Sequence, residues 1–149
     1  MITGIYAGIC GLLLVVLYVR ISQRRLATKI GVGSGGDAEL EQRVRAHGNL
    51  VESAPLALIL LYLIEQSGLS ELFVHALGAT FIAARVAHAQ GISTTTGRSA
   101  GRFYGSLGTV ILLFIMSALL IARTIGGYGQ ARHSHTSPAS TSIETPTTA

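Results

Sequence analysis

Four long apolar runs, separated by short polar segments, dominate the hydrophobic pattern of the chain. The first run, Ile2 to Val19, contains no charged residue, and the last, Tyr104 to Ala122, is strongly apolar. The two runs between them are as long but carry polar residues. A membrane-spanning helix needs about 20 mainly apolar residues. We therefore expect four membrane-spanning helices, near residues 2–22, 45–66, 72–91 and 103–123.

The polar segments indicate where these helices begin and end. The sequence "GVGSGG" at residues 31–36 is typical of a flexible loop, and Asp37 after it can cap the second helix by accepting a hydrogen bond from a first-turn amide. That helix would begin outside the membrane, and Pro55 should kink it or loosen a turn. The acidic segment "EQSGLSE" at residues 65–71 predicts a tight turn.

The composition changes after Gly126 to Ser, Thr, Pro and His. This change predicts a disordered polar tail over residues 127–149, after a four-helix membrane domain over residues 1–126. The first run has no basic residue before it and no Ala-x-Ala pattern after it, so we expect a retained anchor rather than a cleaved signal peptide.

The composition supports a membrane protein. Of 149 residues, 49% are hydrophobic and only 12% are charged, against about 25% charged in soluble domains. The net charge of +4 is small and lies mostly beside the helix ends, which argues against a nucleic-acid partner. The single cysteine, Cys10, cannot form an intrachain disulfide and is interpreted as a small buried apolar residue.

The basic residues predict the orientation in the membrane. The third loop region carries Arg98 and Arg102, and the second loop has acids but no base. The first loop region carries Arg20, Arg24, Arg25, Lys29, Arg43 and Arg45. Because cytoplasmic loops are enriched in Lys and Arg, loops one and three should face the cytoplasm. Arg123 and Arg132 argue mildly against this orientation.

Three polar residues mark the point where the second helix enters the membrane. Arg45, Asn49 and Glu52 are spaced i, i+4 and i+7, so they lie within about 60° of arc on one helix face. Ionisable groups at such a depth usually face the bundle interior and indicate a functional site. An arginine fork binds a carboxylate, asparagine donates and accepts, and glutamate accepts from an ammonium or amide. Together they suit a zwitterionic, peptide-like ligand.

The same three residues also fit a structural alternative. In that alternative, Arg45 and Glu52 form an internal bridge and Asn49 joins two helices, since interhelical polar contacts hold membrane bundles together.

Further polar residues lie on the third and fourth helices. Arg85 and His88, spaced i, i+3, would neighbour the first cluster. Alternatively, Arg85 snorkels to the interface and His88 is a satisfied interhelical histidine. His75 lies at the opposite membrane end. Arg102 stands at a helix N-terminus, where a cation opposes the helix dipole. It would anchor the helix or stabilise an anion such as a thiolate.

The sequence does not predict a metal site. The spacings of common metal-binding motifs are not met, and His133 and His135 form only a weak pair in the predicted tail.

Three segments of the sequence resemble the MAPEG family, the membrane-associated proteins of eicosanoid and glutathione metabolism. "RVRAHGNLVESAPLALILL" resembles that family's Arg-x-x-x-Asn-x-x-Glu signature. "RVAHAQGI" and "GRSAGRFYGSLGT" resemble its third-helix end and fourth-helix start. The resemblance covers most of residues 5–123, and it is nearest to short bacterial members.

The resemblance implies an all-α, four-helix protomer in a homotrimer of the bacterial inner membrane, with glutathione bound as co-substrate between subunits near the cytoplasmic side. Membrane lipids and a lipophilic small molecule would be further partners. Arg102 would stabilise the thiolate as the catalytic residue. The implied ligand-binding residues, with Arg85 added as their neighbour, are Arg24, Arg25, Arg45, His47, Asn49, Glu52, Arg85 and His88.

Three positions depart from the family pattern. Ser53 replaces a tyrosine, Ile92 an aromatic residue and Phe103 a serine found in some relatives. The ligand is therefore better indicated than the reaction. We expect a glutathione transferase or peroxidase acting on lipophilic electrophiles. The alternatives are a non-catalytic membrane protein of this type and a small proton-coupled exporter.

Overall fold

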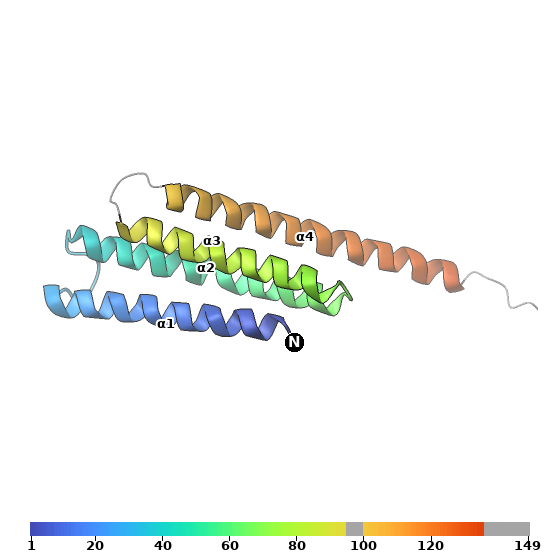
Figure 1. Cartoon of the computed structure of the whole chain (residues 1–149), viewed down its shortest axis with the longest axis horizontal. Helices are drawn as coiled ribbons and strands as arrows, with labels where there is room; N and C mark the ends of the chain where they lie inside the picture. Colours follow the sequence, from blue (N-terminus) through green and yellow to red (C-terminus); the bar gives the residue numbers. More distant parts are fainter. Residues whose placement is uncertain (95–99, 136–149) are drawn as a thin grey trace, which may run out of the picture.

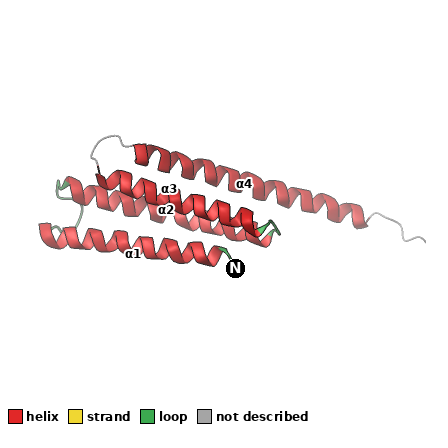
Figure 2. Cartoon of the chain, viewed as in Figure 1, coloured by secondary structure: helices red, strands yellow, loops and turns green. Residues whose placement is uncertain are grey.

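The computed structural model describes residues 1–94 and 100–135, which form an all-helical bundle (Figure 1, Figure 2). Each of the helices is long and apolar enough to cross a membrane, as the hydrophobic pattern predicts. The helices in these residues are α1 (Thr3–Thr28), α2 (Ala38–Gln66), α3 (Glu71–Thr94) and α4 (Ala100–His135).

Consecutive helices run in opposite directions, and α2 and α3 lie between α1 and α4 (Figure 1). Within the described residues, α1 contacts α2 and α3, and α4 contacts α3 and α2, but α1 and α4 do not touch each other. The loop between α1 and α2 lies at the same end of the bundle as the end of α3 and the start of α4. We call this the loop-1 end; the N-terminus and the α2–α3 turn lie at the other.

Carboxylates fix the starts of two helices. The Asp37 side chain accepts from the backbone N–H of Leu40 at 2.6 Å, which confirms the predicted cap of α2. Glu65, near the end of α2, accepts from the backbone N–H groups of Ile2 at 2.6 Å and Thr3 at 2.9 Å. Its carboxylate thus satisfies amide groups at the start of α1, which otherwise lack intrahelical partners.

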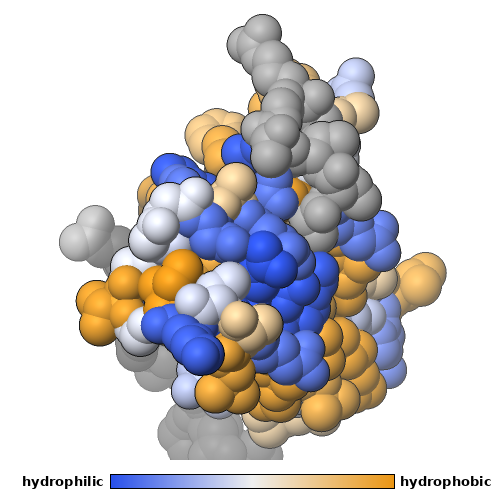
Figure 3. Space-filling view, turned by 90° about the vertical axis from the view of Figure 1, so that its left-hand side faces the viewer, coloured by the Kyte–Doolittle hydropathy of each residue, from blue (hydrophilic) through white to orange (hydrophobic). Residues whose placement is uncertain are grey.

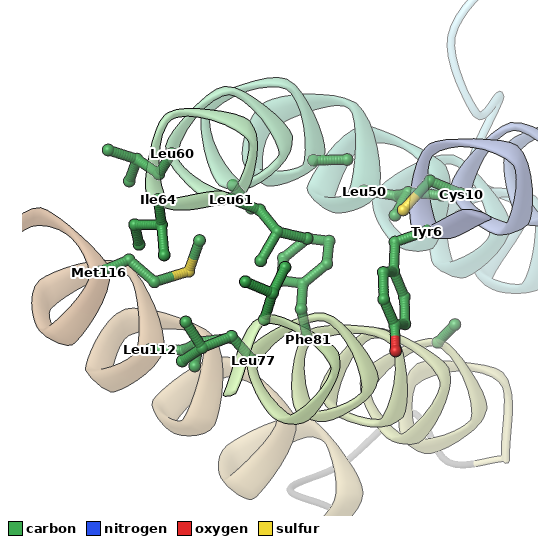
Figure 4. Packing of buried hydrophobic residues seen from close by; sticks show 14 of the residues in the cluster. Tyr6, Cys10, Leu50, Leu60, Leu61, Ile64, Leu77, Phe81, Leu112 and Met116 are labelled. Atoms are coloured by element: carbon green, nitrogen blue, oxygen red, sulfur yellow. The ribbon is translucent and has the colours of Figure 1, made fainter. Parts of the chain in front are cut away.

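The core lies between the middle helices and is closed by α1 on one side and α4 on the other (Figure 4). Ile64 of α2, Phe81 of α3 and Met116 of α4 are almost completely buried. Cys10 of α1 is buried among apolar residues, as predicted. The outward faces of the helices carry many exposed apolar side chains, such as Leu12, which suits contact with lipid.

The helix limits differ most from the prediction in two places. Helix α1 continues past residue 22 to Thr28, and α4 continues past the predicted tail start at 127 to His135. The sequence has no proline between these predicted limits and the observed ends, so hydrophilic composition alone does not stop either helix. The rest of the predicted tail, residues 136–149, lies outside the described residues. Pro55 lies within α2, which the structure describes as one helix.

Candidate functional site

Helices α3 and α4 approach each other closely at the loop-1 end because glycines line the contact. A Cβ atom at Gly105 would lie only 2.7 Å from the Ala84 carbonyl oxygen, and one at Gly101 would lie 2.9 Å from the Ala87 carbonyl oxygen. Small residues four apart let membrane helices pack backbone to backbone. This contact brings the polar residues of α3 against the start of α4.

Arg85 is buried at this contact, with only 3% of its surface exposed. Its Nη2 donates to the Gly105 carbonyl oxygen at 2.8 Å and to the Thr109 hydroxyl of α4. Its Nη1 donates to the Asn49 Oδ1 and to the Ser53 Oγ of α2, the latter at 3.3 Å. Arg85 therefore joins three helices. The predicted neighbourhood with Asn49 is confirmed, and the snorkelling alternative is wrong.

Within residues 1–94 and 100–135, the hydrogen-bond partners of Arg85 are all neutral, and its Nε is buried without a partner. A buried cation is costly unless its donors are satisfied. Four neutral acceptors compensate most of its donors, so the charge remains as a fixed positive group inside the bundle.

His88 lies on the same face of α3, one turn closer to the loop-1 end. Its Nδ1 is 3.1 Å from the Arg102 backbone carbonyl oxygen and 3.1 Å from the Ser106 Oγ, both on α4. The ring is buried. The interpretation of His88 as an interhelical histidine is thus confirmed.

A cavity of about 400 Å³ opens beside these residues, within the range of roughly 300–1,000 Å³ typical of small-molecule sites. It brings together five of the predicted site residues from three helices. Its lining consists of Val44, Arg45, Gly48, Asn49, Glu52, His88, Ile92 and Arg102. Hydrophilic side chains gather at this end of the molecule, bordered by apolar surface (Figure 3).

The polar face of α2 is placed differently from the prediction. The Arg45 side chain is 66% exposed and pairs with Glu41 at 2.8 Å, and Glu52 is also exposed. The expectation that all three residues face the bundle interior is wrong, because Ala46 and Leu50 occupy the buried face of α2. The two charged residues form the rim of the cavity.

The structural alternative for this face is only partly correct. Glu52 makes no hydrogen bond or ion pair within residues 1–94 and 100–135, so the internal Arg45–Glu52 bridge does not form there. Asn49 does join two helices, through its contact with Arg85.

The two arginines at the end of α1 organise the first loop. Arg24 pairs with Asp37 at 2.8 Å and with Glu39 at 2.9 Å, and its guanidinium lowers the pKa of the Asp37 carboxyl. Arg25 donates to the carbonyl oxygens of three loop residues, at 3.0–3.3 Å: Ile30, Gly31 and Gly33. Neither arginine lines the cavity.

The remaining histidines of the membrane domain also lie away from the cavity. The His47 ring is 6.2 Å from the Tyr18 ring of α1, measured between centroids. His75, at the opposite end, contacts the Tyr6 hydroxyl at 2.9 Å through Nδ1. Roles in ligand binding for His47, Arg24 and Arg25 stay predictions.

Several residues of the site were not predicted from the sequence. Gly105, Ser106 and Thr109 hold Arg85 and His88 from α4, and Ser53 assists from α2. The spacing of Gly101 and Gly105 is the signal that indicates this close helix contact.

Two of the positions that depart from the family pattern have different surroundings. Ile92 is buried and lines the cavity. Phe103 is 64% exposed and lies edge-on to Tyr104, with ring centroids 5.4 Å apart. Among the described residues, no group of three or more His, Cys, Asp or Glu is placed to hold a metal ion.

Comparison with known proteins identifies the family of the chain. Residues 3–122, which include all residues that line the cavity, match the MAPEG family. The chain belongs to the MAPEG family. This MAPEG protein is 33% identical over 91 residues to the inner membrane protein YecN of Escherichia coli strain K12, covering 61% of this chain and 70% of YecN. YecN of E. coli O6:H1 gives the same values. Together with the four apolar helices, these matches show a membrane protein.

Proposed function

We propose that this MAPEG protein binds glutathione in the cavity and directs its thiol at lipophilic electrophiles, as a transferase or peroxidase. One observation carries the proposal: Arg45, Asn49, Glu52, His88 and Arg102 line a single cavity at one end of a membrane bundle. Family membership adds support.

The rim residues complement the charged ends of a small peptide. Glutathione carries an ammonium group and two carboxylates. Glu52, exposed and without a partner among the described residues, is available to an ammonium group. Arg45 offers a planar fork that binds a carboxylate in bidentate fashion, after releasing Glu41. The deeper polar residue Asn49 is left for the peptide backbone.

Arg102 supplies the positive charge for the reacting sulfur. A nearby cation lowers the pKa of a thiol and so raises the fraction of thiolate, which is the nucleophile. In transfer, the thiolate sulfur bonds to an electrophilic carbon, and the electron pair of the broken bond goes to the leaving group. In peroxide reduction, the sulfur attacks the terminal oxygen of the hydroperoxide and the O–O bond breaks. The alkoxide leaves and takes up a proton to give the alcohol, and the glutathione becomes its sulfenic acid. A second glutathione then gives the disulfide and water.

The lipophilic substrate would reach the cavity from the bilayer. Val44 and Ile92 give the cavity an apolar wall. Phe103 and Tyr104 lie exposed on α4 directly after Arg102, and aromatic side chains favour the membrane interface. We propose loops one and three on the cytoplasmic side, which places the cavity where glutathione is available.

We also propose a homotrimer with glutathione held between adjacent subunits. The rim position of Arg45 and Glu52 supports this proposal, because a charged face at membrane depth needs cover from protein or ligand.

Titration of glutathione into the purified protein tests the proposed ligand. We expect the wild type to bind and Glu52→Ala to bind at least about 10-fold more weakly, since hydrogen bonds to charged groups contribute roughly 1.5–3 kcal/mol. Glu71→Ala, which removes an exposed carboxylate at the opposite end, is the matched control and should bind normally. A wild type that does not bind glutathione would refute the proposal.

The reaction is tested separately with Arg102→Ala. We expect glutathione to bind while turnover of a reactive aryl halide or lipid hydroperoxide falls by about 10²–10³-fold, as when one electrostatic stabiliser is removed. If the wild type binds glutathione but turns over no substrate in a broad panel, the protein is a non-catalytic glutathione-binding protein.

A further inference from the structure

We propose that contacts behind the cavity fix its hydrogen-bonding polarity: Arg85 makes Asn49 a donor, and the Arg102 carbonyl makes His88 an acceptor. A peptide backbone, which offers both acceptors and donors, satisfies a cavity with one fixed donor and one fixed acceptor. The choice of glutathione as the peptide rests on the proposed function, but the polarity itself does not.

The orientation of the Asn49 carboxamide follows from its contact with Arg85. A guanidinium has only donors, so the atom that faces Arg85 Nη1 must be the oxygen Oδ1. Ser53 supports this arrangement, because its Oγ donates to the Asn49 backbone oxygen at 2.7 Å and accepts from the same Nη1 at 3.3 Å. The NH₂ group of Asn49 then points away from Arg85.

That NH₂ group is available to a ligand. Its nitrogen has no hydrogen-bond partner among the described residues. Among these residues, the side-chain atoms that are both buried and unpartnered are Thr3 Oγ1, Arg43 Nε and Arg85 Nε, and Asn49 Nδ2 is not one of them. It therefore keeps accessible surface, and Asn49 lines the cavity. Asn49 offers the cavity two N–H donors and no side-chain acceptor.

The tautomer of His88 is set in the same way. The Arg102 carbonyl oxygen can only accept, so Nδ1, at 3.1 Å, carries the proton and shares it with Ser106 Oγ. In the neutral ring, Nε2 is then an acceptor. Nε2 also has no partner among residues 1–94 and 100–135. It is not one of the buried unpartnered atoms, so it keeps accessible surface. His88 lines the cavity, so this acceptor faces it.

The two groups together select the chemical class of the ligand. A carbonyl oxygen of a peptide backbone accepts from Asn49 Nδ2, and a backbone N–H donates to His88 Nε2. A carboxylate offers only acceptors and an ammonium only donors, so neither satisfies both residues. We therefore assign the peptide backbone of the ligand to Asn49 and His88, and its charged ends to Arg45 and Glu52.

Asn49→Asp separates this proposal from a purely structural role of Asn49. The aspartate keeps an acceptor for Arg85 but has no donor for a ligand. We expect a melting temperature at or above that of the wild type, with glutathione binding at least about 10-fold weaker. Asn49→Ala should lose both stability and binding. If Asn49→Asp is as unstable as Asn49→Ala, or binds as tightly as the wild type, the proposal is wrong.

Ser53→Asp controls for the added negative charge. It places a carboxylate beside Arg85, one turn further along α2, and keeps an amide at position 49, while it removes the Ser53 hydroxyl that contacts Asn49. We expect Ser53→Asp to bind glutathione more tightly than Asn49→Asp. Equal weakening by the two variants would mean that charge, rather than the lost donor, decides binding, and would overturn the proposal.

The His88 tautomer is measured without any ligand. In protein labelled with ¹⁵N-histidine, the signals of His88 are identified by their loss in His88→Gln. We expect a protonated Nδ1 and a bare Nε2; a protonated Nε2 would overturn the proposal. If the wild type does not bind glutathione, the proposed function is refuted but the proposed polarity is not. The polarity is still tested by the His88 tautomer and by the melting temperature of Asn49→Asp, since neither measurement needs a ligand.

Discussion

Arg85 shows how a single residue connects packing to the site. Its guanidinium is buried among neutral acceptors from α2 and α4, where a planar group with five donors satisfies several partners at once. The same contacts that make its burial tolerable also orient Asn49. The residue therefore acts on the cavity without lining it.

Arg85→Ala should destabilise the protein by about 2 kcal/mol or more, because hydrogen bonds to charged groups each contribute roughly 1.5–3 kcal/mol and relief of the buried charge offsets part of the loss. Thermal unfolding in detergent measures this. Arg85→Lys should lie between Ala and wild type, since an ammonium is a point charge rather than a fork. Arg123→Ala, at an exposed position of α4, is the control. Equal melting temperatures for Arg85→Ala and the control would contradict this role.

At the level of elements, the contact between α3 and α4 depends on the absence of a side chain at Gly105. Gly105→Ala places a Cβ atom 2.7–2.8 Å from the Ala84 carbonyl oxygen, the His88 Cβ and the His88 backbone nitrogen. Backbone cannot yield as a flexible side chain can, so the helices must separate. We expect a loss of about 1–3 kcal/mol, as for overpacked cores.

Gly108→Ala is the matched control for this prediction. Its Cβ would meet only the Ala84 Cβ, at an ordinary 3.7 Å. Alanine favours helix over glycine by up to about 1 kcal/mol, so Gly108→Ala should unfold at or above the wild-type temperature. If the two variants behave alike in thermal unfolding, the close contact at Gly105 does not hold α3 and α4 together.

The helices could be predicted from the sequence because lipid imposes strong requirements on length and composition. The four apolar runs and the Asp37 cap are local properties, and each appears where the pattern predicts it. The ends of α1 and α4 were less predictable, since polar residues continue a helix once it leaves the membrane.

The site was only partly predictable, because its geometry depends on contacts between helices. Spacing placed Arg45, Asn49 and Glu52 on one face of α2, and they do share the cavity with Arg102. Spacing cannot say how that face is rotated relative to α3, so the rim position of the charged residues was missed. Nor does it reveal Thr109 or Ser106, whose roles arise only where α4 meets Arg85 and His88.

At the level of the whole molecule, one chain leaves a charged rim at membrane depth. Glu52 is exposed within the candidate span Ala38–Gln66, where a carboxylate in contact with lipid is costly. A second subunit over this face would remove the cost. We therefore expect native mass spectrometry from mild detergent to show three copies of the 15.6 kDa chain. A protein that remains monomeric under these conditions would contradict the trimer.

The expected orientation of the molecule rests on its basic residues, several of which are paired. Arg24 pairs with Asp37 and Glu39, and Arg45 pairs with Glu41, which reduces the net charge of the loop-1 end. The positive-inside rule, however, counts Lys and Arg rather than net charge, and acidic residues contribute little. The loop-1 end should therefore lie in the cytoplasm despite these ion pairs.

Cysteine labelling in intact cells tests this orientation. Ser34→Cys places a thiol in the first loop and Ser70→Cys places one before α3 at the other end; the native Cys10 is buried in α1 and should give little background. A membrane-impermeant maleimide should label Ser70→Cys in intact cells and Ser34→Cys only after permeabilisation. The reverse pattern would put the cavity, and with it the proposed glutathione site, on the side of the membrane away from the cytoplasm.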